Sequence, residues 1–221
     1  MPEEPRISKS QPWKERERMK GKEEKFWEAL YEASRRSSRA GAVMFAVMTG
    51  GDPCSEEELA EICRESWEAQ IALLEEAHRL FRNESVWEAS CLLLAHIFAL
   101  PRDMRDMAKL FQAAGMEAPG RLSELGKLDC RAAEELEKIF GYAPQLEENY
   151  MKAEARCQRI RNYEKRGEAC LREGMKALFT PGVDPAALIL WKEGYERAGA
   201  LLEKERETAD LFQHVARHLL L

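Results

Sequence analysis

Glu75 and His78 have the residue types and the spacing that can bind a metal ion. They lie three positions apart in a segment with helical periodicity, so both face one side of the expected helix. Carboxylate-bridged di-iron bundles use two Glu-x-x-His pairs of this kind, and the sequence contains no second one. A metal site built on Glu75, His78 and His96 is therefore the less favoured interpretation. The favoured one is that His78 is partly exposed and contacts charged neighbours.

The remaining histidines suggest metal or proton chemistry only weakly. His214 and His218 are one helical turn apart, a spacing at which two imidazoles can share a metal ion, but they lack the Glu of an HExxH zinc-protease motif. His96 lies in the apolar segment 91–100, where a buried imidazole needs a hydrogen-bond partner. No cysteine is followed by a recognisable oxyanion loop. We therefore assign no catalytic residue and interpret the chain as non-enzymatic.

The strongest local signal is positive charge in the segment 152–176. It holds eight basic residues against four acidic ones, in a chain of net charge -6. Basic side chains along one helix can track a nucleic-acid backbone, because they neutralise phosphates and release counterions. The residues that carry this hypothesis are Lys152, Arg156, Arg159, Arg161, Lys165 and Arg166. The favoured alternative is that this stripe pairs with an acidic surface of the same chain or a sister chain, such as the segment 55–83 with eight Glu against three Arg.

The first half of the chain is predicted to form helices, which would carry Glu75, His78 and His96. Apolar and small residues recur every three or four positions over 22–48, and GGDP at 50–53 ends that stripe. Ser55, followed by three Glu, has the form of an N-cap and predicts a helix over 55–82. The segment 91–100 is apolar on all sides, which predicts a place at the centre of a bundle.

The middle of the chain is expected to contain shorter helices separated by loops. Pro101 stands where a new helix can begin, and this helix would end at Gly115. The segment 117–129 contains Pro and Gly and is predicted to be an irregular connection. A short helix is then expected over 131–140.

The last third of the chain predicts a long antiparallel hairpin over 144–221. Two helical stripes, over 144–179 and from Pro185 nearly to the end, are joined by the tight turn 180–185. No segment has the alternation of a strand. We therefore expect an all-α protein, with a charged tail over 1–21 and one multi-helix bundle over 22–221 that ends in this hairpin.

Composition limits the compartment and the cofactors. The six cysteines, which form no CxxC pair, are expected to be free thiols in the cytoplasm. The chain opens without the apolar core of a signal peptide, and its apolar runs at 40–48 and 91–100 are well short of the ~20 residues that span a bilayer. We expect no membrane contact, and a chain of 221 residues needs no cofactor to form a core.

Two functional hypotheses follow from these features. The first is a non-enzymatic helical subunit or adaptor of a larger assembly, with a protein partner or a second copy of the chain bound through the hairpin and the tail. Trp13, Trp27 and Trp191 are its candidate exposed aromatic residues. The second is a nucleic-acid-binding subunit that uses the basic stripe, and a metal-binding bundle ranks below both.

Overall fold

The computed structural model is all-helical in the residues that it describes. These are 12–50, 55–81, 83–180, 182 and 184–220, with only the backbone described at 12–20 and 55. The elements are α1 (Pro12–Met48), α2 (Ser55–Leu80), α3 (Glu84–Ala114), α4 (Gly120–Tyr142), the 3-10 turn η1 (Ala143–Gln145), α5 (Leu146–Leu178) and α6 (Pro185–Leu220). The all-α prediction is confirmed.

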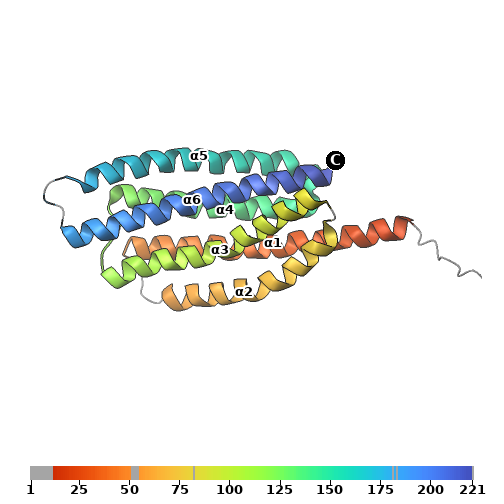
Figure 1. Ribbon diagram of the computed structural model, residues 1–221, viewed down its shortest axis with the longest axis horizontal. Coiled ribbons are helices and arrows are strands. Elements are labelled where there is room, and N and C mark those ends of the chain that lie inside the picture. Colours follow the sequence, from red (N-terminus) through yellow and green to blue (C-terminus); the bar gives the residue numbers. More distant parts are fainter. Residues whose placement is uncertain (1–11, 51–54, 82, 181, 183, 221) are drawn as a thin grey trace, which may run out of the picture.

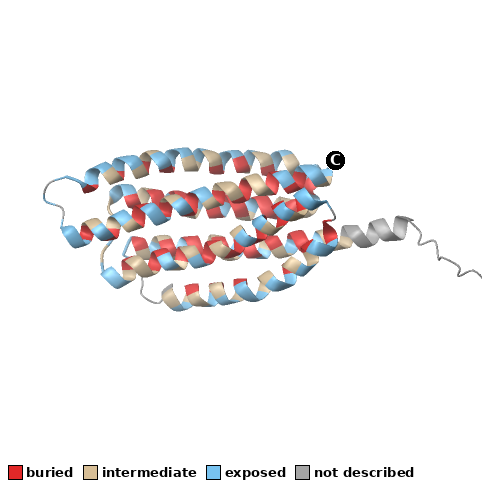
Figure 2. Ribbon diagram, in the orientation of Figure 1, coloured by how far each residue is buried: buried red, intermediate tan, exposed pale blue. Residues whose placement is uncertain are grey.

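The helices form two three-helix units that pack side by side. One unit contains α1, α2 and α3, and the other contains α4, α5 and α6. Contacts of α1 with α4 and of α3 with α6 join the units, so these four helices form the centre. The outer helices α2 and α5 lie on opposite sides of the bundle (Figure 1). Buried residues are concentrated on the central helices, as Figure 2 shows.

The first helix begins earlier than the sequence predicted. α1 starts at Pro12, within the segment 1–21 that was assigned to the tail, and ends at Met48 as expected. Glu, Lys and Arg favour a helix even where no core is available, and proline is well tolerated in a first turn. The part of the tail prediction that concerns residues 1–11 lies outside the described residues.

The predicted break at Pro101 is wrong, because α3 continues through it. Proline has no N–H to donate to the carbonyl of Ile97 four residues earlier. The buried Ser37 of α1 places its Oγ 3.3 Å from that carbonyl oxygen and 3.2 Å from the carbonyl oxygen of Ala33. The hydroxyl has one proton, which either carbonyl can accept, so it can compensate in part for the missing backbone bond.

The predicted irregular connection over 117–129 is also wrong. α4 already begins at Gly120, so the helix expected over 131–140 is much longer. Leu122, Leu125 and Leu128 belong to its buried stripe. Gly126, which lies inside this segment, has a role in close packing, since a Cβ there would lie 2.8 Å from Sδ of Met48.

The C-terminal hairpin has the form that the sequence predicted. α5 and α6 pack along each other, joined by a short turn. Their alternating residues form the contact, with Cys157 and Ile160 of α5 and Ala198 and Phe212 of α6 all buried. Gly174 allows the helices to approach, because any Cβ at this position would collide with the ring of Tyr195. In the described part of the chain, no helix is both long enough and apolar enough to cross a membrane.

Candidate functional site

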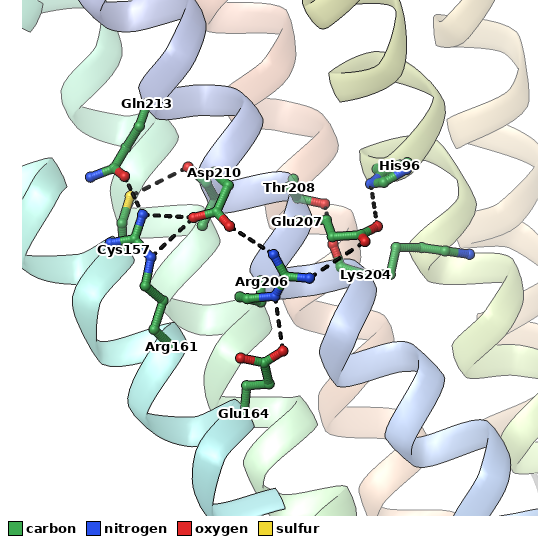
Figure 3. A network of polar contacts seen from close by, with 11 residues as sticks. His96, Cys157, Arg161, Glu164, Lys204, Arg206, Glu207, Thr208, Asp210 and Gln213 are labelled. Atoms are coloured by element: carbon green, nitrogen blue, oxygen red, sulfur yellow. Dashed lines mark hydrogen bonds and ion pairs between the residues drawn. The ribbon is translucent and has the colours of Figure 1, made fainter. Parts of the chain in front are cut away.

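A chain of charged contacts joins α5 to α6 across the hairpin (Figure 3). Arg161 of α5 donates to Asp210 Oδ1 over 2.6 Å from Nη2 and 3.0 Å from Nε, and also to Oε1 of Gln213. Arg206 donates to the other oxygen of Asp210 over 2.8 Å and to Glu164 over 2.9 Å. Asp210 is therefore held between two guanidinium groups, one from each arm of the hairpin.

The polar contacts continue from α6 to α3. Glu207 Oε2 lies 3.9 Å from Nδ1 of His96, which is an ion-pair distance rather than a hydrogen bond. Nδ1 has no hydrogen-bond partner in the described part of the chain, so the partner expected from the sequence is missing at this nitrogen. Burial lowers the pKa of His96, and the charge of Glu207 opposes that shift only in part. The neutral imidazole is the favoured form.

Two neighbouring cavities lie along this network. One measures about 540 Å³ and is lined by residues of α3, α5 and α6, including Arg161, His214 and Arg217. The other measures about 550 Å³ and lies between α3 and α6, with His96 in its wall. Asp210 and His214 line both cavities. Three of the four histidines of the described chain, namely His96, His214 and His218, therefore line these two spaces.

The structure divides the predicted basic stripe into an inward and an outward set. Arg156 and Arg161 point to Glu135 of α4, over 3.1 Å, and to Asp210 of α6. The outward set is exposed on α5 and consists of Lys152, Arg159, Lys165 and Arg166. Two of these also lie near acids of α4, Arg159 at 3.7 Å from Glu135 and Arg166 at 3.8 Å from Glu124. Acids of the same chain thus contact the basic stripe, as the favoured alternative predicted. These acids come from α4 and α6 and not from the segment 55–83.

The acidic segment 55–83 has a different basic partner from the one expected. Arg36 lies 3.3 Å from Glu65, and Arg39 lies 2.7 Å from Glu58. These pairs join α1 to α2, whereas α5 lies on the opposite side of the bundle (Figure 1). A basic cluster of α1, RRSSR at residues 35–39, therefore contacts the Glu residues of α2, and the outer face of α5 does not contact them.

The metal candidates do not come together. Glu75 pairs with Arg79 at 3.7 Å, and the ring of His78 packs edge-on against Trp87 with centroids 5.1 Å apart. His96 faces α6 instead. Among the described residues, no group of three or more His, Cys, Asp or Glu side chains could hold a metal ion.

Two buried carboxyl groups, Asp129 of α4 and Glu205 of α6, were not recognised as candidates from the sequence. Both side chains are 0% exposed, and none of their four oxygens has a hydrogen-bond partner in the described structure. Burial raises the pKa of both groups well above the ordinary range, and the charge of Asp129 raises that of Glu205 further. The neutral acids are the favoured forms. The sequence could have indicated Glu205, because this acid lies in the apolar stripe predicted for the last helix.

The exposed apolar residues also differ from those expected. Trp27 is buried at 3% exposure, Trp191 is half-buried, and the side chain of Trp13 lies outside the described residues. Trp67 and Ile71 of α2 are instead 67% and 58% exposed. They are one helical turn apart and form an exposed apolar pair, which we call the α2 pair. The sequence could have indicated this exposed pair, because both residues lie outside the apolar stripe predicted for the helix over 55–82.

The described chain contains six long helices arranged as two three-helix units, so the protein belongs to the class of all-helical bundles. Within it, the fold is similar to the crystal structure of a PhoU-like protein from Shewanella oneidensis MR-1, with a TM-score of 0.62 and 11% identity over 87% of this chain and 99% of that one. A PhoU-like phosphate regulatory protein from the same organism has a TM-score of 0.60 and 13% identity over 87% and 99%. No protein-family model and no curated protein matches the chain.

Proposed function

We propose that this chain is a non-enzymatic regulatory subunit of the cytoplasm that acts by binding another protein, in a phosphate-responsive system. The observation that carries the proposal is the α2 pair, since Trp67 and Ile71 leave apolar surface in water on an outer helix. Tryptophan is among the residues that contribute most to protein interfaces. The similarity in fold to a PhoU-like phosphate regulatory protein supports the regulatory part.

The proposal predicts that a partner is lost when the α2 pair is made polar. The double variant Trp67→Ser/Ile71→Ser is expected to reduce the recovery of a specific partner at least about tenfold, because interface aromatic residues often contribute 2 kcal/mol or more to binding. The measurement is quantitative mass spectrometry of proteins that co-purify with the tagged full chain from its native cells. Light scattering of the purified chain shows whether the partner is a second copy.

A matched control is available on another helix. Phe179 and Ile189 are 71% and 69% exposed near the turn between α5 and α6. The double variant Phe179→Ser/Ile189→Ser removes a similar apolar area and is expected to retain the partner. Equal recovery with the wild type and both double variants would contradict the proposal, as would a wild-type chain that is monomeric and has no partner.

We propose nucleic-acid binding as a second candidate, carried by the exposed cations on the outer face of α5. Lys152, Arg159, Lys165 and Arg166 are exposed there. Binding of a fluorescent single-stranded RNA is expected to weaken by about tenfold or more between about 50 and 200 mM salt, since each neutralised phosphate releases a counterion. Lys165→Glu/Arg166→Glu should abolish it. Absence of binding at the lower salt concentration, or binding insensitive to salt, would reject this candidate.

A further inference from the structure

The cavity of about 540 Å³ lies where the first turn of α3, the last turns of α6 and the middle of α5 meet. Its polar lining includes Ser85, Arg161, Gln213, His214, Arg217 and His218. A space of this size can hold a small organic ligand or an ion with its waters. We call it the α3–α6 cavity.

The charged groups around the α3–α6 cavity favour an anion. Arg161 and Arg217 line it together with two imidazoles, against a single carboxylate, Asp210. Asp210 already accepts hydrogen bonds from Arg161 and Arg206, so its charge is compensated. Arg217 donates to the hydroxyl of Tyr150 over 2.9 Å and lies 3.7 Å from Glu154, with 61% of its side chain exposed. A guanidinium group thus stays accessible from the cavity.

The first turn of α3 adds backbone donors to the same space, next to one acidic residue, Glu84. The helix begins at Glu84, after Asn83, whose Oδ1 accepts a hydrogen bond from the amide of Val86 over 3.3 Å. Ser85 and Val86 line the cavity, and Oγ of Ser85 is 3.5 Å from Nε2 of His214. The amide groups at the start of a helix carry partial positive charge and are common phosphate ligands.

Gln213 provides an independent observation. Its side chain lines the cavity, is only 5% exposed, and uses Oε1 to accept from Arg161. Its Nε2 has no hydrogen-bond partner among the described residues, and in Figure 3 it points away from the contact between Arg161 and Asp210. A buried amide donor without an acceptor is unfavourable. Nε2 itself has almost no accessible surface, so only a rotation of the side chain would bring this donor to an oxygen atom in the cavity.

We propose that the α3–α6 cavity binds a phosphate group, either as inorganic phosphate or as a small phosphate monoester. Arg217 and His214 supply donors from α6, and the first turn of α3 supplies them from the opposite wall. Donors on several sides suit a dianion with tetrahedral oxygens better than a planar carboxylate. The assignment rests on the cavity alone, and it does not depend on the proposed contact through α2.

Titration calorimetry of the purified full chain tests the site in buffer of low ionic strength. Inorganic phosphate and O-phospho-L-serine are the two probes, and the one that binds more tightly identifies free phosphate or a monoester as the ligand. We expect a Kd of about 1 mM or lower for at least one of them. Acetate should bind more weakly, because it has a single negative charge and a planar carboxylate.

Variants show whether binding occurs in the cavity. Arg217→Gln and His214→Gln are each expected to weaken phosphate binding, by about tenfold for Arg217→Gln, because a charge-assisted contact is lost. Arg172→Gln is the matched control, since this arginine of α5 is 68% exposed and pairs only weakly with Glu168 at 3.8 Å. The proposal is overturned if the wild type binds neither probe, if acetate binds equally well, or if all three variants behave alike.

Discussion

Replacing Glu205 by Gln is expected to leave stability almost unchanged near pH 4 and to increase it at pH 7. Burial and the neighbouring Asp129 raise the pKa of Glu205 in the folded protein. The unfolded chain releases this proton above about pH 4.3, whereas the folded protein retains it. Each further pH unit therefore costs the wild type about 1.4 kcal/mol until the folded pKa is reached. Gln carries no such proton and avoids this loss.

Urea unfolding of the wild type and of Glu205→Gln at several pH values between 4 and 8 measures this difference. Glu203→Gln is the matched control, because Glu203 lies two residues away on the same helix and is exposed. Its stability should follow the wild type at every pH. Asp129→Asn should resemble Glu205→Gln, and the two effects should not add, because the charge of Asp129 contributes to the raised pKa of Glu205. Parallel curves for the wild type and Glu205→Gln would show that Glu205 is ionised in the folded state.

The long stripes of the hairpin could be predicted because their pattern is local. Alternation of three and four positions in α5 and α6 determines which face is buried, whatever lies opposite. The continuation of α3 through Pro101 could not be predicted in this way. The carbonyl that Pro101 leaves without a backbone donor lies instead 3.3 Å from Oγ of Ser37, which is 64 residues before Pro101 in the chain. Local sequence signals indicated a new helix at Pro101 and an irregular connection over 117–129, whereas the structure continues α3 through Pro101 and begins α4 at Gly120.

The candidate sites could be predicted only in part for a similar reason. The basic stripe was visible in the sequence, but the separation of Arg161 from Lys165 depends on the acids that α6 brings alongside α5. The α3–α6 cavity combines residues about 130 positions apart, such as Ser85 and His214. No spacing motif connects them. The sequence therefore paired His214 with His218 but could not connect them with Ser85 or Arg161, which line the same cavity.

Truncation of Phe212 to Ala is expected to destabilise the protein by about 3 to 5 kcal/mol. The Phe212 side chain is 0% exposed. Its ring packs edge-on against Trp27 of α1, with centroids 5.7 Å apart, and against Phe140 of α4 at 5.5 Å. Its removal leaves a cavity between three central helices, and it breaks a contact between the two three-helix units.

The matched control is Phe179→Ala, which removes the same side chain from a position that is 71% exposed. Its effect should stay within about 0.5 kcal/mol. Urea unfolding followed by circular dichroism and by tryptophan fluorescence measures both variants. Because Phe212 of α6 packs on Trp27 of α1, the two units should unfold together, and both signals should shift to lower urea by the same amount. Separate transitions, or equal stability of the two variants, would contradict a core that is continuous across both units.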